Sequence, residues 1–229
     1  DILKRIKKNE PINEFITKKY DITRQTVRNY INELINDNII KQDGKKYKII
    51  MNIKEYTYSN IESLHEDIVF NEIIEPVIKN YKENVKFIIN YSFTEMLNNA
   101  IDHSETKEIK IILAFTYEIF AVLIMDYGIG IFRKIKEKKN LKNEKQAILE
   151  LKKGKLTTDE KNHTGEGIFF TSRMVDIFEI SSFGDIFRGN GQKDKIFHDI
   201  NREKQNFSTM VGFAVFKDSK VEVTDIFKK

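Results

Sequence analysis

The stretch that decides the fold is Tyr91-Ser-Phe-Thr-Glu-Met-Leu-Asn-Asn-Ala-Ile-Asp-His-Ser104. Its polar residues Glu95, Asn99 and Asp102 are spaced i, i+4 and i+7, which places them on one face of a helix. The other face carries the apolar residues that a packed helix requires: Phe93, Leu97, Ala100 and Ile101. An amide oxygen can bind a hard cation such as Mg²⁺, and a carboxylate can accept a proton from an attacking water. The helix therefore offers Asn99 as a candidate metal ligand and Glu95 as a candidate general base.

A first glycine motif, Asp126-Tyr-Gly-Ile-Gly130, comes directly after the apolar run 119–125. The length and β-branched content of that run predict a strand. An aspartate at the end of a strand can accept a hydrogen bond from a donor such as an exocyclic amine. Gly128 and Gly130 would let the backbone pass close to a flat ligand.

A second glycine motif, His163-Thr-Gly-Glu-Gly-Ile-Phe-Phe170, opens a predicted helix over residues 168–175. The amide groups at a helix N-terminus are suited to binding phosphate, so Gly165 and Gly167 are candidate phosphate contacts. Either glycine motif alone is also common in ordinary turns, and only their combination with the helix above points to a ligand.

Together, in this order, the motifs resemble the GHKL ATPase superfamily of gyrase, heat-shock chaperone ATPases, histidine kinases and mismatch-repair ATPases. The resemblance covers about residues 60–217. It matches Glu95-x-x-x-Asn99 to the N box and the two glycine motifs to the glycine boxes. Ser208-Thr209, which leads into a predicted strand over 210–216, matches the late threonine box.

The resemblance implies that the chain binds ATP and Mg²⁺. Asn99 would then hold the metal, Glu95 would orient or deprotonate water, and Asp126 would receive the adenine amine. The other nucleotide-binding residues that it implies are Asp102, Gly128, Gly130, Gly165, Gly167 and Thr209. The implied fold class is an α/β (α+β) two-layer sandwich of the GHKL type, with a mixed and largely antiparallel sheet, over residues 67–217.

Within that domain, the sequence predicts a helix near 67–80 and strands over 109–115, 118–125, 176–183 and 210–216, with a polar excursion between the last two. Residues 133–164 are Lys-rich and have few large apolar residues apart from a helical patch at 147–151. This superfamily places its ATP lid there. We expect the lid to gain order only with Mg·ATP, because little apolar burial is available to offset the entropy of ordering it. Lys153 and Lys155 are candidates to approach phosphate.

The first 50 residues hold 12 Lys+Arg against 7 Asp+Glu, whereas the remaining residues hold 27 against 28. The basic excess of the chain therefore lies in its N-terminal fifth, which favours a polyanionic partner for that segment. Residues 53–66 have little hydrophobic pattern and are expected to form a connector. Residues 218–229 read as a tail that could lead into a further domain.

Residues 1–52 are expected to form a winged helix-turn-helix domain. Three short apolar stripes predict helices that bury Phe15, Ile16, Val27 and Tyr30 among others, and Asp43-Gly44 between two short runs predicts a hairpin. Residues 22–40 resemble the turn, the recognition helix and the entry to the wing of that family. The side chains placed to reach DNA bases are Arg24, Gln25, Thr26 and Arg28, and those placed to touch phosphate are Lys45 and Lys46. Winged helices also serve in dimerisation or docking, so a homodimer or a protein partner stays open.

No apolar run reaches the roughly 18 residues that a membrane span requires, and the N-terminus lacks the apolar core of a signal peptide. With no cysteines, disulfides and thiolate metal sites are excluded, and a cytoplasmic protein is expected. His65 precedes the N box too closely to lie on a separate phosphoacceptor hairpin.

The function expected is an ATP-binding regulatory switch, a slow Mg-dependent ATPase coupled to DNA or partner binding. The alternatives are a serine/threonine protein kinase of the anti-sigma-factor kinase type and a nucleotide-sensing DNA-binding regulator without turnover.

Overall fold

The structure, a computed structural model, describes residues 1–153, 166–189, 194–202 and 204–227. The chain divides into two compact units. The first comprises residues 1–52 with 115–117, and the second comprises residues 53–114 with 118–229.

The first unit has three helices followed by a hairpin, in the order that the sequence predicts. Its elements are α1 Ile2–Lys7, α2 Asn13–Tyr20, α3 Arg24–Asn36, β1 Ile40–Asp43 and β2 Lys46–Ile49. Thr23 caps α3, because its hydroxyl accepts a hydrogen bond from the Thr26 amide at 3.1 Å. The hairpin closes over Gly44, whose φ of 59° suits glycine. Five aliphatic side chains form the buried core: Ile6, Ile16, Val27, Ile31 and Ile40.

Two aromatic residues of this unit were expected in its core, and the structure corrects both. Phe15 is 40% exposed and Tyr30 is 47% exposed. The buried core is small and aliphatic, and an aromatic ring outside such a core can be partly covered by charged side chains. The Arg5 guanidinium lies 3.9 Å from the centre of the Phe15 ring.

The second unit is built on a seven-stranded antiparallel sheet with the strand order β3-β4-β5-β9-β6-β7-β8. Its strands are β3 Asn52–Tyr58, β4 Ile109–Phe115, β5 Ile119–Asp126, β6 Ile177–Ser182, β7 Asp185–Gly189, β8 Lys195–His198 and β9 Thr209–Phe216. The last strand, β9, inserts between β5 and β6, so Phe213 pairs with Val122 on one side and Phe178 on the other. The parallel pairing of the expected mixed sheet is not seen among the described strands.

Three strands were missed by the sequence patterns. Residues 53–58 form most of β3 rather than a connector, and β7 and β8 lie in the expected polar excursion. β3 and β8 are the edge strands of the sheet and are largely exposed, so they lack the apolar alternation that marks a half-buried strand. An ion pair between Glu55 and Lys110, 2.6 Å apart, helps to hold β3 against β4.

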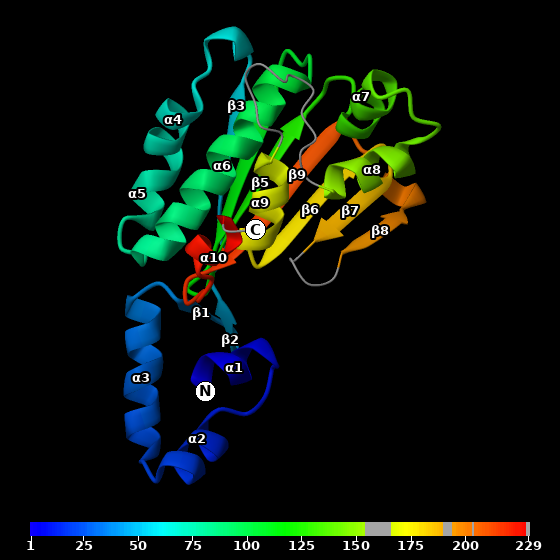
Figure 1. The fold of residues 1–229 in the computed structure, drawn as a ribbon. Helices are drawn as coiled ribbons and strands as arrows, with labels where there is room; N and C mark the ends of the chain where they lie inside the picture. The colour runs from blue at the N-terminus through cyan, green and yellow to red at the C-terminus, as the bar shows by residue number, and fades with distance from the viewer. Residues whose placement is uncertain (154–165, 190–193, 203, 228–229) are drawn as a thin grey trace. The chain divides into compact units, whose positions relative to one another are not determined.

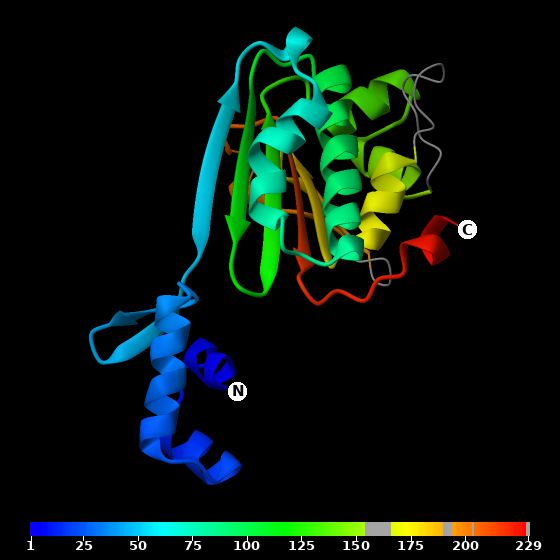
Figure 2. The same ribbon diagram turned by 90° about the vertical axis from the view of Figure 1, so that its left-hand side faces the viewer.

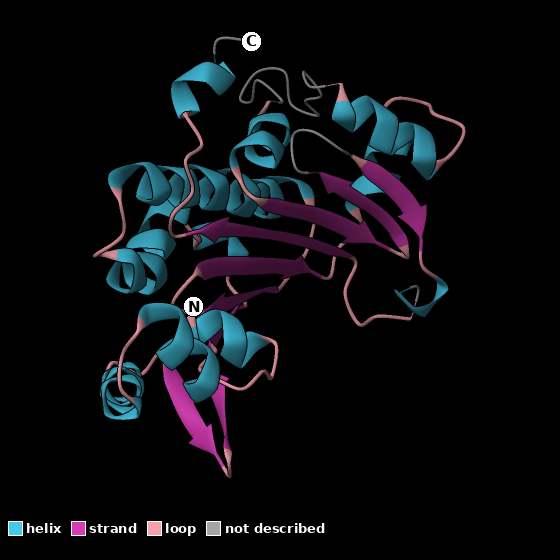
Figure 3. Cartoon of the chain, turned by 90° about the horizontal axis from the view of Figure 1, so that it is seen from below, coloured by secondary structure: helices cyan, strands magenta, loops and turns pink. Residues whose placement is uncertain are grey.

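The helices of the second unit lie on one face of this sheet, which gives two layers (Figures 1 and 2). They are α4 Glu66–Val69, a π-helical stretch Phe70–Ile74, α5 Glu75–Ile78, α6 Glu83–His103, α7 Ile131–Lys138, α8 Glu144–Lys152, α9 Gly167–Met174 and α10 Val223–Phe227. Short 3₁₀ turns occur at Ile61–Ser63 and Ile200–Arg202. Figure 3 shows the strands side by side beneath this helical layer.

Helix α6, which carries the N box, is the central helix of the layer. It packs on β5, β9 and α9. Phe93 and Leu97 are fully buried as predicted, while Ile101 is only partly buried. The apolar face of α6 therefore fixes where its polar face lies.

The expected lid, 133–164, is in part a packed structure. Residues 133–153 include most of α7 and all of α8, which pack against each other. Ile135 of α7 and Ile148 and Leu151 of α8 are buried there, because their helical spacing places them on one face of each helix. The expectation that this whole segment has too little apolar surface to be ordered was therefore wrong for its first part. Residues 154–164, with Lys155, lie outside the described residues.

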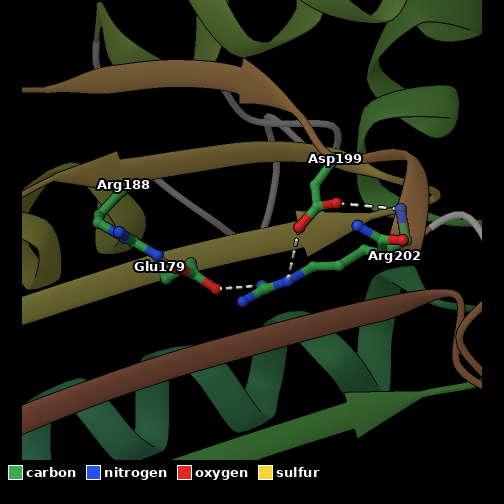
Figure 4. A network of polar contacts seen from close by, with 5 residues as sticks. Glu179, Arg188, Asp199 and Arg202 are labelled. Carbon is green, nitrogen blue, oxygen red and sulfur yellow. Dashed lines mark hydrogen bonds and ion pairs between the residues drawn. The ribbon is translucent and has the colours of Figure 1, made fainter.

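A network of charged residues joins β6 and β7 to the turn 199–202 (Figure 4). The Glu179 carboxylate accepts hydrogen bonds from Arg188 and from Arg202. The distance from Arg188 Nε to Glu179 Oε2 is 2.8 Å. Burial would raise the pKa of the Glu179 carboxyl, but the hydrogen bonds from Arg202 and Arg188 outweigh it and lower the pKa below its ordinary value. The network thus ties the end of β8 to the sheet near its edge.

Candidate functional site

Residues from three of the sequence motifs and part of the fourth lie along the C-terminal half of α6 and at its end. Asp126, the last residue of β5, pairs across the sheet with Thr209, the first residue of β9. Gly167, the first residue of α9, lies directly against Glu95 of α6. Gly165 lies outside the described residues.

Asp126 is a buried carboxylate, 5% exposed. Its Oδ1 accepts a hydrogen bond from the Gly128 amide at 3.0 Å, and its side chain also bonds to that of Thr209. Burial raises the pKa of the Asp126 carboxyl above its ordinary value, although these two hydrogen bonds act in the opposite direction. Its described partners are an amide and a hydroxyl rather than a cation, so its negative charge is solvated only by dipoles.

Residues 126–131, which we call the Asp126 turn, are held by hydrogen bonds from their own amides to protein acceptors. The pairs are Tyr127 N to Thr106 Oγ1 at 3.1 Å, Gly128 N to Asp126 Oδ1 at 3.0 Å, Ile129 N to Ser104 O at 3.0 Å and Ile131 N to Thr209 Oγ1 at 3.1 Å. These four amides are already satisfied without a ligand. The turn is therefore a preformed support for the carboxylate rather than an array of amides that awaits phosphate.

Both glycines of the turn are explained by packing within the protein. A Cβ at Gly128 would lie 1.7 Å from the carbonyl oxygen of Ser104, at the end of α6. Gly130 has a φ of 86°, and a Cβ there would lie 2.5 Å from the ring of Phe183. The sequence interpretation assigned this room to a flat ligand, whereas the structure fills it with the chain's own atoms.

Glu95 and Asn99 occupy the same helical face, as their spacing predicts. Asn99 Nδ2 donates to the backbone oxygen of Glu95 at 2.8 Å, which directs the amide oxygen, the atom able to bind a metal, away from the helix backbone. A Cβ at Gly167 would lie 2.0 Å from Glu95 Oε2, so the carboxylate occupies space that only glycine leaves. The start of a helix favours such a negative charge. Asp102, one turn further along, is exposed.

Several supporting residues were not found from the sequence. Ser104 and Thr106 accept hydrogen bonds from amides of the Asp126 turn. The Lys134 ammonium donates to His103 O at 2.7 Å and to Glu105 at 2.9 Å. The two Lys134 contacts join the end of α6 to α7 across more than twenty-five residues of sequence. For Ser104 and Thr106, the only signal in the sequence was that two hydroxyl residues follow the N-box helix directly.

The first unit contains a groove of about 760 Å³ that is lined by α3, by the hairpin and by the segment that joins α1 to α2. Five of the six residues predicted to contact DNA line it: Arg24, Gln25, Arg28, Lys45 and Lys46. Thr26 is not among the lining residues, because its hydroxyl lies 2.9 Å from that of Thr23 in the N-terminal cap of α3. Four of these side chains are cationic and the groove has one acidic lining residue, Glu10, so its net charge is positive.

No protein-family model matches this chain, and a search of curated proteins finds no match either. Among the described residues, no cluster of three or more His, Cys, Asp or Glu side chains is placed to hold a metal ion. None of the described helices is long and apolar enough to cross a bilayer.

Asp126→Asn is expected to make the ligand-free protein more stable at neutral pH. The amide keeps the shape and the acceptor oxygen of the side chain but removes a buried charge. Because the pKa of Asp126 is raised in the folded state, its contribution is fully present below its ordinary value of 3.8 and is lost as the pH rises through the folded pKa. The stability gap between Asp126→Asn and wild type should thus widen from pH 4 to pH 7 in urea titrations. A gap that stays constant over this range would contradict the buried charge.

Proposed function

We propose that the second unit binds Mg·ATP and hydrolyses it slowly, as a regulatory switch. The observation that carries the proposal is the buried carboxylate of Asp126, held by an amide and a hydroxyl. A carboxylate kept buried without a cationic partner lowers stability, and such groups concentrate at binding sites. A carboxylate can accept more hydrogen bonds than these two, and an exocyclic amine is a donor that could supply another. Adenine offers such an amine, whereas guanine presents an oxygen at the equivalent position.

The phosphate end of the proposed ligand would lie toward Glu95, Asn99 and the start of α9. The Asn99 amide oxygen, turned from the helix backbone, fits a Mg²⁺ ligand. Bound Mg²⁺ would neutralise charge on the phosphate oxygens. Glu95 would orient the attacking water and accept its proton. The amides at the start of α9 would face the phosphates.

Two alternatives use the same site. A serine/threonine kinase of the anti-sigma-factor kinase type would employ the same Glu95 and Asn99 but transfer phosphate to a protein. A nucleotide sensor would bind ATP without turnover. Phosphate release by the purified protein alone supports the ATPase, transfer to a protein partner supports the kinase, and binding without either supports the sensor.

Asn99→Ala is expected to abolish Mg·ATP binding, because the variant has no amide oxygen for the metal. Glu95→Gln should bind Mg·ATP but lose turnover by about 10²–10⁴-fold, since it lacks a general base while keeping the packing against Gly167. Asn98→Ala, next to the site on the same helix, is the control. Calorimetry and a phosphate-release assay measure the two effects. Normal binding and turnover in both variants would mean that the N-box assignment is wrong.

Asp126→Asn should weaken ATP binding and reduce the preference of the protein for ATP over GTP. A carboxylate only accepts hydrogen bonds, whereas an amide can rotate to donate to the guanine oxygen. Asp218→Asn, which neutralises an exposed aspartate, is the control. The dissociation constants for both nucleotides report the outcome, and an unchanged ratio would argue against Asp126 as the adenine anchor.

We also propose that the first unit binds DNA, so that nucleotide binding and DNA binding are coupled in one chain. The supporting observation is the groove that brings α3 and the hairpin together with four cationic side chains. A recognition helix and wing that present Arg, Gln and Lys in this way suit base edges and phosphates. The alternative is a docking or dimerisation module.

DNA affinity should fall steeply as the salt concentration rises, because each cation that contacts a phosphate releases counterions. Arg28→Ala is expected to weaken binding to a specific site by about 1–3 kcal/mol. Lys18→Ala, on α2 and outside the groove, should have little effect. Fluorescence anisotropy with labelled duplexes measures both. If no DNA is bound at low salt by micromolar protein, the docking-module alternative is favoured.

A further inference from the structure

The peptide group that joins Asp126 to Tyr127 is held at both of its ends. The carbonyl oxygen of Asp126 accepts a hydrogen bond from the Ser208 amide at 2.8 Å. The Tyr127 amide donates to Thr106 Oγ1 at 3.1 Å. A peptide group is planar, so fixing its oxygen and its nitrogen removes its rotation. The direction in which the Asp126 side chain leaves the backbone is thereby restricted.

The Thr106 hydroxyl has no remaining hydrogen-bonding capacity. A threonine hydroxyl has one donor and two acceptor positions. Thr106 Oγ1 donates to Glu108 O at 2.7 Å and accepts from the amides of Glu108, at 3.2 Å, and Tyr127, at 3.1 Å. All three positions are used within the protein, so the hydroxyl is oriented before any ligand arrives.

The loop that carries Thr106 is itself anchored to the N-box helix. Ser104 Oγ donates to Ala100 O in the last turn of α6, and Thr106 N donates to Ser104 Oγ at 3.2 Å. Ser104 O accepts the Ile129 amide at 3.0 Å. Ala100 follows Asn99, the proposed metal ligand, directly in the sequence. A short chain of hydrogen bonds therefore leads from the residue next to that ligand to the turn that holds Asp126.

We propose that Thr106 is a positioning residue that sets the base specificity of this site, by aiming the Asp126 carboxylate through the 126–127 peptide. The inference rests on the proposed binding of ATP by the second unit. Ser208 holds the same peptide through its backbone amide, which a side-chain substitution leaves in place. Thr106 is therefore the side chain whose substitution can test how the direction of the Asp126 carboxylate affects binding.

A positioning role and a merely structural role differ in what they change. If Thr106 only stabilised its loop, its loss would lower the stability of the protein and weaken the binding of every nucleotide to the same extent. If Thr106 fixes the direction of the Asp126 side chain, its loss should weaken the binding of ATP, which uses the carboxylate. The affinity for GTP should stay nearly unchanged. The ratio of the two affinities therefore separates the roles.

The experiment compares Thr106→Val, which keeps the shape and removes the hydroxyl, with Thr106→Ser, which keeps the hydroxyl. Mg·ATP and Mg·GTP are titrated into each full-length protein by calorimetry. Thr106→Val should weaken ATP binding about tenfold, the effect expected if the lost hydrogen bond from the Tyr127 amide is the one that matters for ATP, and Thr106→Ser should restore it. Thr94→Val removes a hydroxyl that donates to Asn90 O within α6 and is the control.

Equal losses of ATP and GTP affinity, or no change in either, would overturn the proposal for Thr106. A wild-type protein that binds neither nucleotide would instead overturn the proposed function, so the two failures are distinguishable. Circular dichroism establishes that each variant is folded. If Thr106→Val is not folded, Thr106→Ala removes the same hydroxyl without adding a branched apolar group, and the same ratio decides.

Discussion

The packing of α6 on the central strands is the interaction on which the rest of the second unit depends. One face of this helix is buried against β5 and β9, which leaves Glu95 and Asn99 on the face toward α9. The same helix ends at Ser104, whose carbonyl receives the Asp126 turn. The apolar interface of α6 therefore sets the positions of both ends of the candidate site, because side chains on a rigid helix cannot move independently of its core face.

Departures from ordinary local preferences gather around the Asp126 turn. Asp126 keeps a charge in a buried position, and Phe183, a bulky residue, has a φ of 48° where its ring packs on Gly130. Glu105, between the two residues that accept amides of the turn, has a φ of 59°. Conformations of this kind are unfavourable and persist where the surrounding structure imposes them, which is common at functional sites. Their location agrees with a site whose geometry is fixed before the ligand binds.

The sequence predicted the parts of the fold whose apolar periodicity is strong, and missed the parts held by long-range contacts. α6, β4, β5 and β9 follow from patterns of 3.6 or 2 residues, and Asp43-Gly44 predicted the hairpin. β3 and β8 could not be found in the same way, because strands at the edge of a sheet are exposed and lack the apolar–polar alternation. β7 is a five-residue strand with two adjacent apolar residues, so it shows no alternation either. The roles of Ser104 and Thr106 depend on pairing with residues more than twenty positions away, which a single sequence does not reveal.

If the site binds ATP, the geometry also says where a switch must act. A ligand shifts a conformational equilibrium only through contacts that differ between the two states. The Asp126 turn is already held by the protein, so the adenine end offers little that can change. The start of α9 is different, because the Glu95 carboxylate lies against Gly167, next to the amides proposed for phosphate. A phosphate there would bring like charges together and disfavour the present position of Glu95. The conformational response to ATP should therefore begin between α6 and α9, at the phosphate end of the site.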